Sequence, residues 1–196
     1  MRLHRQIVPL LFCLAASCGG DKPAQSSTPA TTPATASSAA DALPPITPVK
    51  AVEALTPAEV SAAFGGAVFK VTEERNDPPA GYSCISGCNY VEEGPEEIRK
   101  RHLMITVRSH GVEKDAADFL KNRLEMARET GVQVALAPEL GEHAFISHRS
   151  AASGGTKIEY RRGKDYFELA YVVLASTTPE ENTTLLTGLA RASLAP

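Results

Sequence analysis

Thiols are the side chains of this chain with the clearest capacity for chemistry. They fall into two groups, one near the start and one near the middle: Cys13, Cys18, Cys84 and Cys88. A basic start, a short apolar run and small residues precede Cys18, an order that is typical of a secretory signal peptide and its cleavage site. Ala16 and Ser17 fit a peptidase pocket that excludes bulk, and the thiol of Cys18 is a nucleophile suited to a thioether-linked diacylglycerol. We therefore predict a signal peptide over residues 1–17 and lipidation of Cys18.

The predicted lipid determines where the chain resides. The apolar run from Ile7 to Ala16 is about ten residues long, whereas a helix that spans a bilayer needs roughly 20, so we expect an anchor made of acyl chains. The motif is typical of bacterial lipoproteins, although Ala15 stands where leucine is usual. An ordinary cleaved signal and an uncleaved apolar N-terminus are the alternatives. We expect the chain in the bacterial cell envelope, with the outer membrane or periplasmic face favoured because Gly19 is not the aspartate that retains many lipoproteins in an inner membrane.

Cys84 and Cys88 would be the two remaining thiols in an oxidising compartment, where such pairs usually form a disulfide. Along an extended strand, four residues would separate their Cα atoms by about 13 Å, whereas a disulfide requires roughly 4.4 to 6.8 Å. We therefore predict a disulfide with a turn at Gly87 between the two cysteines. A redox-active pair and a metal-binding pair are the alternatives.

The histidines and serines lack the spacing of a metal or catalytic site. His102 and His110 would lie about 26 Å apart on one strand, and His143 and His148 would point to opposite faces of another. Ser147 adjoins His148, but neighbours on a strand diverge, and the sequence contains no Gly-x-Ser-x-Gly motif. We predict no catalytic residue, no metal ligand and no cofactor.

The charge balance argues against a polyanionic partner. The net charge of the whole chain is -3, and removal of residues 1–17 would leave 18 basic and 23 acidic residues, a net charge of -5. The basic run at residues 99–101 follows two glutamates, which is typical of a solvated surface of mixed charge. We therefore expect no binding of nucleic acid.

A linker separates the predicted signal peptide from the helices and strands that position the other residues. Residues 18–48 consist mainly of alanine, serine, threonine and proline, with almost no bulky apolar side chain. Such a composition buries too little surface to offset the entropy lost on ordering. We predict a disordered tether over residues 18–48 and a single globular domain over residues 49–196, which is long enough to bury a core.

The domain is predicted to be α+β. Thr56 to Glu59 forms a capping box that starts a short N-terminal helix. Two strand-strand-strand-helix units follow it, an order that favours an antiparallel β-sheet with helices packed against it. We expect strands at 68–74, 88–92, 102–110, 143–148, 156–162 and 166–175, and longer helices at about 114–130 and from 179 onward. The last strand is apolar on both faces, so we expect it in the middle of the sheet.

Short motifs spread over residues 54–195 carry a resemblance. They are Leu-Thr-Pro-Ala-Glu-Val at 55–60 with Phe-Gly at 64–65, Cys-Asn-Tyr at 88–90, Gly-Glu-x-Ala-Phe at 141–145 and Arg-Arg-Gly at 161–163. In these motifs the chain resembles a family of small bacterial cell-envelope lipoproteins of unknown function with a PsbP/Mog-like α/β sandwich domain. The resemblance implies a non-enzymatic accessory protein of the envelope and supplies no catalytic residues.

Two functional classes follow from the sequence. The expected one is a non-catalytic binding or structural module, held on the membrane through its N-terminal lipid, that contacts another envelope protein or a small ligand. Its candidate contact residues are Tyr82, Ile85 and Tyr90, an apolar and aromatic set beside the predicted disulfide. The alternative is a hydrolase-like envelope enzyme whose site the sequence does not reveal.

Overall fold

The computed structural model of the protein describes residues 44–94, 100–149, 155–173 and 178–194. The predicted signal peptide, the lipidation site Cys18 and most of the predicted linker lie outside these residues.

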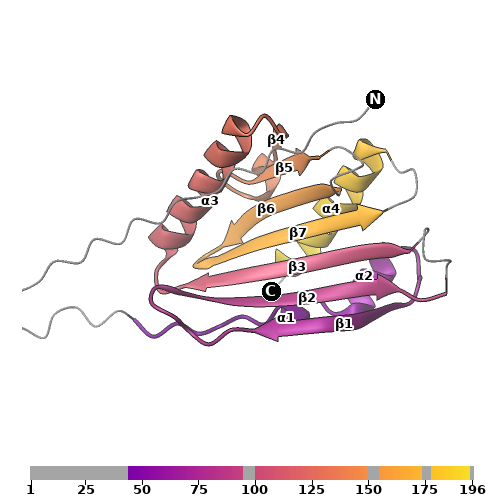
Figure 1. Ribbon diagram of the computed structural model, residues 1–196, viewed down its shortest axis with the longest axis horizontal. Coiled ribbons are helices and arrows are strands. Elements are labelled where there is room, and N and C mark those ends of the chain that lie inside the picture. The colour runs from indigo at the N-terminus through magenta and orange to yellow at the C-terminus, as the bar shows by residue number, and fades with distance from the viewer. Residues whose placement is uncertain (1–43, 95–99, 150–154, 174–177, 195–196) are drawn as a thin grey trace, which may run out of the picture. The chain divides into compact units, whose positions relative to one another are not determined.

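A seven-stranded antiparallel sheet forms the centre of the described domain (Figure 1), with the strand order β1-β2-β3-β7-β6-β5-β4. The strands are β1 (Phe69–Asn76), β2 (Ser83–Glu92), β3 (Arg101–His110), β4 (Gln133–Leu136), β5 (Phe145–His148), β6 (Thr156–Arg162) and β7 (Asp165–Val173). The helices are α1 (Ala51–Ala54), α2 (Pro57–Ala63), α3 (Glu113–Glu129) and α4 (Pro179–Leu194), with a 3-10 turn at Pro138–Leu140. The predicted α+β class is confirmed, and β7 is the middle strand of the sheet.

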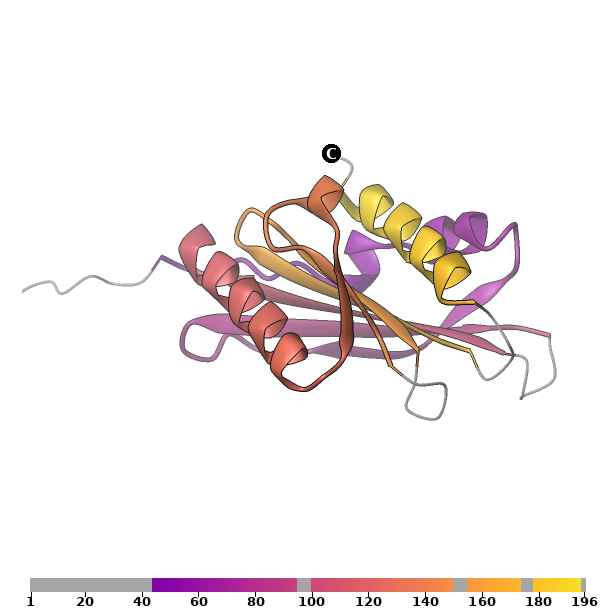
Figure 2. The same cartoon turned by 90° about the horizontal axis from the view of Figure 1, so that it is seen from above.

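The helices cover the two faces of the sheet unequally (Figure 2). α1, α2 and α4 lie on one face and enclose the main core, which includes Leu103 of β3 and Leu169 of β7. α3 lies on the other face, where Leu120 packs in a second, smaller cluster with Tyr166. α3 contacts β3, β4, β6 and β7. No described helix covers the corresponding face of β1, β2 and most of β3, which we call the open face.

Strand β2 shows which residues face each side. Its even-numbered side chains are buried against the main core, and its odd-numbered side chains are half-buried on the open face. β2 pairs with β3 without interruption, from Ser83 opposite His110 to Val91 opposite His102. The predicted strand began only at Cys88, so the sequence pattern missed the first five residues of β2.

The segment that precedes α1 lies against the sheet. The amide of Val49 donates a hydrogen bond of 3.1 Å to the hydroxyl of Ser109 on β3. The amide of Ala51 donates one of 2.8 Å to the hydroxyl of Ser86 on β2. We call residues 44–50 the entry segment, because it leads the chain across β3 to the start of α1.

The predicted capping box is present at the start of α2. The hydroxyl of Thr56 accepts a hydrogen bond of 3.3 Å from the amide of Glu59. The carboxylate of Glu59 in turn accepts one of 2.7 Å from the amide of Thr56. Two amides that would otherwise be unsatisfied at the helix start are thereby paired.

The two edge strands differ in how they end the sheet. β1 carries a bulge at Thr72, where the register shifts between Val71 opposite Tyr90 and Glu73 opposite Asn89. β4 is only four residues long and pairs with β5. β4 was not predicted from the sequence, and with it the second unit of the fold has four strands before its helix.

Candidate functional site

The structure does not form the predicted disulfide. Cys84 and Cys88 are both free and buried on the same face of β2. The prediction required a turn at Gly87, but Cys84 pairs with Ser109 and Cys88 with Ile105 in one continuous ladder. Cysteines four residues apart on such a strand are separated by about 13 Å, beyond the reach of a disulfide. The prediction failed because the strand includes residues that we expected to turn.

The three predicted contact residues do not lie on one surface of the structure. Tyr82 precedes β2 and is 67% exposed, and Ile85 is half-buried on the open face. Tyr90 is fully buried in the main core, where its hydroxyl donates a hydrogen bond to the carbonyl oxygen of Leu55. Burial raises the pKa of Tyr90 above its usual range. The prediction of Tyr90 as an exposed contact residue is therefore wrong, because the alternation of β2 turns it inward.

Gly87 lies near the middle of β2, at a position that belongs to the open face. Its register partners are Arg75 on β1 and Thr106 on β3. A β-carbon added at Gly87 would meet only the carbonyl oxygen of Ile105, at an ordinary 3.8 Å, and its φ is not among the positive ones. The backbone therefore does not require glycine here, although glycine inside a strand costs roughly 0.5–1 kcal/mol relative to alanine. What the glycine provides is the absence of a side chain.

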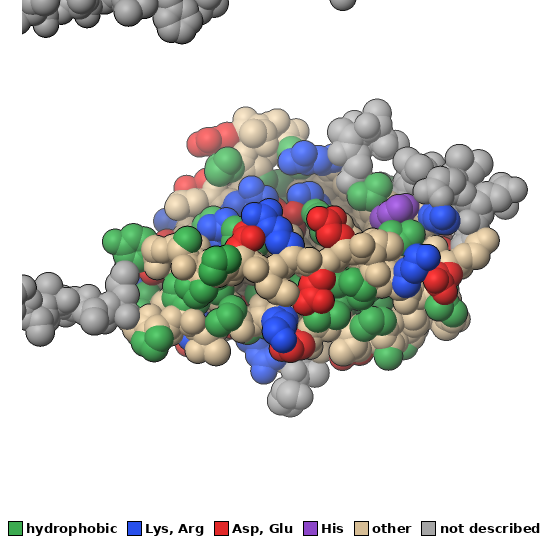
Figure 3. Space-filling view, turned by 60° about the horizontal axis from the view of Figure 1, so that its bottom comes forward, with side chains coloured by type: hydrophobic (Ala, Val, Ile, Leu, Met, Phe, Trp, Pro, Cys, Tyr) green, Lys and Arg blue, Asp and Glu red, His purple; other side chains and the backbone are tan. Residues whose placement is uncertain are grey.

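A depression of about 200 Å³ lies at this position. Side chains from three strands line it, and we call it the Gly87 depression. Its apolar lining comes from Ile85 and Met104, and its polar lining from Glu73, Arg75, Asn89 and Thr106. Apolar walls with a few placed polar groups are typical of recognition sites. Figure 3 shows hydrophobic, acidic and basic side chains interspersed on the side of the molecule that it draws.

Hydrogen bonds hold the polar rim of the Gly87 depression in place. The side-chain amide of Asn89 donates a hydrogen bond of 2.8 Å to the carboxylate of Glu73. The Nε of Arg75 donates one of 2.8 Å to Asp77, just beyond the end of β1. The rim thus presents a carboxylate and a guanidinium whose positions are set by their neighbours.

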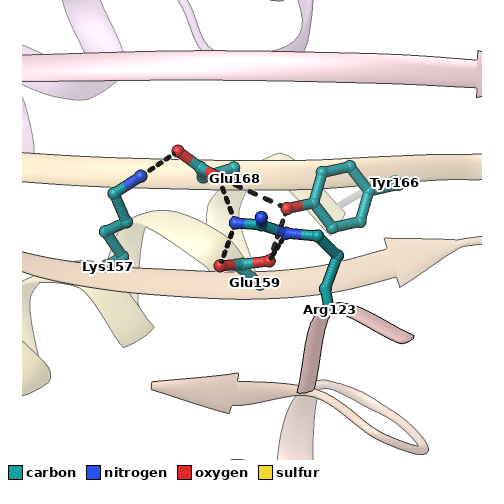
Figure 4. Close-up of polar contacts among 5 residues, drawn as sticks. All are labelled: Arg123, Lys157, Glu159, Tyr166 and Glu168. Carbon is teal, nitrogen blue, oxygen red and sulfur yellow. Dashed lines mark hydrogen bonds and ion pairs between the residues drawn. The ribbon is translucent and has the colours of Figure 1, made fainter. Parts of the chain in front are cut away.

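A second group of polar residues lies beneath α3 (Figure 4). We call it the α3 clamp, and its members are Arg123, Lys157, Glu159, Tyr166 and Glu168. Arg123 donates two hydrogen bonds of 2.9 Å to Glu159 and one of 3.2 Å to Glu168. Lys157 donates one of 2.5 Å to Glu168, and the hydroxyl of Tyr166 donates one of 2.6 Å to Glu159.

The α3 clamp resolves an electrostatic conflict within the sheet. Glu159 of β6 and Glu168 of β7 lie directly opposite each other, an arrangement that is unfavourable for like charges. The two cations neutralise them, and all four carboxylate oxygens accept hydrogen bonds. Burial, together with the two carboxylates, raises the pKa of Tyr166 well above its usual range. Because these groups are engaged with one another, we interpret the clamp as the attachment of α3 to the sheet.

A wider groove of about 580 Å³ lies between α2 and α4. Its lining includes Ala63, Leu185 and Gly188, with the acids of the first turn of α4 at one side. One of these acids, Glu181, accepts a hydrogen bond of 3.0 Å from the amide of Thr178. This groove contains none of the contact residues predicted from the sequence, whereas the Gly87 depression includes Ile85, so we take the Gly87 depression as the candidate site.

Comparisons with known proteins bear on the fold. No family model matches the chain, and no curated protein matches it. Among solved structures, the chain is similar to the extracellular domain of PknH from Mycobacterium tuberculosis, with a TM-score of 0.52 and 11% sequence identity. The similarity covers 75% of this chain and 97% of that one. Within the described residues, every helix is too short or too polar to cross a bilayer. The chain thus shares its fold with an extracellular domain of another protein.

Proposed function

We propose that this chain is a lipid-anchored, non-catalytic binding module of the bacterial cell envelope. In this proposal the Gly87 depression receives an apolar side chain of another envelope protein. The observation that carries the proposal is the glycine itself, which weakens the inner strand β2 without any conformational need and leaves a depression on a face that no described helix covers.

Two observations support the location. The N-terminal sequence places small residues before Cys18 after a short apolar run, as in a lipoprotein signal. The fold is similar to that of an extracellular domain, although identity is only 11%. The motif resemblance to small envelope lipoproteins agrees with this location and extends the proposal to an accessory role.

The dimensions of the depression favour a protein side chain over a small molecule. Sites for drug-sized ligands usually measure about 300–1,000 Å³, and this one measures about 200 Å³. Ile85 and Met104 supply apolar contact, while Glu73 and Arg75 offer an acceptor and a donor to the partner's backbone. A protruding aliphatic side chain on a partner fits this combination.

The α3 clamp supports a non-catalytic role. A general base needs a carboxylate oxygen free to accept the proton of a substrate or water. In the clamp, Arg123, Lys157 and Tyr166 donate hydrogen bonds to the carboxylates of Glu159 and Glu168. We therefore propose that these acids stabilise the fold and do not act on a substrate.

A photo-cross-linking experiment tests the binding site. A benzophenone amino acid replaces Ile85 in the full chain, expressed in the bacterium that makes it, and the matched control replaces the exposed Met126 of α3. We expect one discrete cross-linked partner from position 85 and none from position 126. The additional substitution Gly87→Val should abolish the cross-link, because it fills the depression.

The Gly87→Val chain also controls for folding. Valine favours strands, and its β-carbon has room, so the free energy of unfolding should be equal or higher. Cross-linking that persists in this variant would overturn the proposed site. The anchor is tested separately by metabolic labelling with an alkynyl fatty acid, which should label the wild-type chain and not Cys18→Ser.

A further inference from the structure

We infer that the end of the sheet at which the entry segment meets β3 rests on the bilayer, with Tyr82 and Val112 in its interfacial layer. The inference rests on the proposed lipid anchor and adds to it an orientation of the domain and a second contact with the membrane.

Three segments that are distant in sequence meet at this end of the sheet (Figure 1, left). Ser83 pairs with His110, so Tyr82 and Gly111 continue from the same end of β2 and β3. A β-carbon built on Gly111 would lie 3.6 Å from the carbonyl oxygen of Pro44. Pro44, the first described residue, therefore lies at this end of the sheet, near Gly111.

The surface at this end is apolar. Residues 78–82, Pro-Pro-Ala-Gly-Tyr, carry no charge and are all exposed, and residues 44–49 carry none either. Tyr82 is 67% exposed and Val112 is 41% exposed. In the chain as a whole, 22% of residues are charged. Figure 3, which keeps this end at the left, shows hydrophobic side chains there.

The charges that flank this end nearly balance. Glu113, Lys114 and Asp115 begin α3, and Lys164 and Asp165 lie at the β6–β7 turn, where the carbonyl of Lys164 accepts a hydrogen bond from the amide of His110. A surface with this balance is not drawn strongly to anionic lipids. The contact it fits is insertion of apolar and aromatic side chains into the interface, where tyrosine is enriched in membrane proteins.

The tether makes such a weak contact effective. A domain attached through the proposed flexible tether meets the surface at an effective concentration of about the millimolar range, so a few inserted side chains suffice to bias its orientation. The strands then stand upright on the membrane. Gly87, four residues along β2 from Ser83, lies about 13 Å further from the surface, and the open face points sideways toward neighbouring membrane proteins.

The absence of tryptophan from the chain permits a direct test. Tyr82→Trp and Val68→Trp each introduce a single reporter. Val68 is a matched control because it is 59% exposed and lies at the opposite end of β2, where its carbonyl accepts a hydrogen bond from the amide of Glu93. The chain beginning at Cys18 is coupled through that thiol to a maleimide lipid in phosphatidylcholine vesicles, with one label per chain verified by mass.

We expect brominated phosphatidylcholine to quench the reporter of Tyr82→Trp at least threefold more than that of Val68→Trp. Val112→Asp should reduce the quenching in the Tyr82→Trp chain to the control level, and added salt should leave it unchanged. Equal quenching at the two positions, or none at position 82, would overturn the inference. Because the lipid is attached chemically, this outcome is independent of fatty-acid labelling in cells, so a failure of the anchor and a failure of the orientation are distinguishable.

Discussion

The guanidinium of Arg123 donates two hydrogen bonds of 2.9 Å to the carboxylate of Glu159 and thereby joins α3 to β6. The side chain of Glu159 is 3% exposed and that of Arg123 is 31% exposed. Because Glu168 lies opposite Glu159 in the sheet, the same arginine also keeps two neighbouring carboxylates compatible.

Arg123→Met should lower the free energy of unfolding by about 3 kcal/mol, because it leaves the buried carboxylate of Glu159 without a neighbouring positive charge. This value is the lower end of the range that is usual when one partner of a buried ion pair is removed, because Arg123 is partly exposed. Arg123→Lys should lower the free energy of unfolding by less, because lysine keeps the charge but not the paired hydrogen bonds. Urea denaturation followed by circular dichroism measures both changes.

The control for Arg123→Met is Lys114→Met on the same helix. Lys114 forms an ion pair with Asp118 on an exposed surface, and such pairs contribute little to stability. We expect an unfolding curve indistinguishable from that of the wild type. Equal losses in the two methionine variants would show that the clamp does not hold α3.

His110 should make stability depend on pH. It is 5% exposed, and its Nε2 has no hydrogen-bond partner among the described residues. Burial, and then the charge of Arg108, lowers the pKa of His110 from its ordinary value of 6.5, against the opposing effect of Asp115 and Asp165. The unfolded chain therefore takes up this proton at a higher pH than the folded chain does.

The stability that depends on neutral His110 should be present above about pH 6.5 and should be lost as the pH falls below that value toward the lower pKa of the folded state. His110→Gln should flatten this part of a plot of melting temperature against pH. A slope that persists in His110→Gln would contradict the assignment.

Ser86→Ala should loosen the start of α1 from β2. The buried hydroxyl of Ser86 accepts from the amide of Ala51 at 2.8 Å and donates to the side-chain oxygen of Asn76 at 2.7 Å. Its removal leaves a buried amide without a partner, which costs about 1–3 kcal/mol. Hydrogen exchange at Ala51 should accelerate, whereas it should not in Ser83→Ala, a change at a half-buried position of the same strand.

The thiols of Cys84 and Cys88 should resist alkylation in the folded chain. Both are at least 97% buried, and burial raises the pKa of the Cys88 thiol. Iodoacetamide without reductant should modify neither residue in native buffer and both in concentrated urea. Peptide mapping by mass spectrometry reads out each site, and a peptide that gains two hydrogens on reduction would restore the disulfide that the sequence suggested.

The fold class could be predicted because the patterns of the long elements are strong. β3 alternates over ten residues, and β7 is apolar on both sides, which placed it correctly in the middle of the sheet. β4 was missed because Gln133–Leu136 is short, lies at an edge and is largely exposed, so it carries no alternation. The predicted range of β2 began too late, because a glycine that stands between two cysteines is typical of a turn.

The candidate site was harder to predict for a different reason. The two glutamates of the α3 clamp lie 36 and 45 residues from Arg123 in the sequence, and only strand pairing brings them together. The available signal was a pair of glutamates, Glu159 and Glu168, at positions where strands are otherwise apolar. For the Gly87 depression, the signal was a glycine between alternating residues. It indicates a turn if the strand ends there and a depression in the sheet if the strand continues through it.

The bulge at Thr72 has a consequence for how copies of this protein coexist. An edge strand with unpaired amides and carbonyls is a template on which another chain can add a strand. In β1 the bulge interrupts the regular ladder, and the exposed charges of Glu73, Glu74 and Arg75 follow it. This irregular, charged edge therefore disfavours the addition of a strand from another copy of the chain.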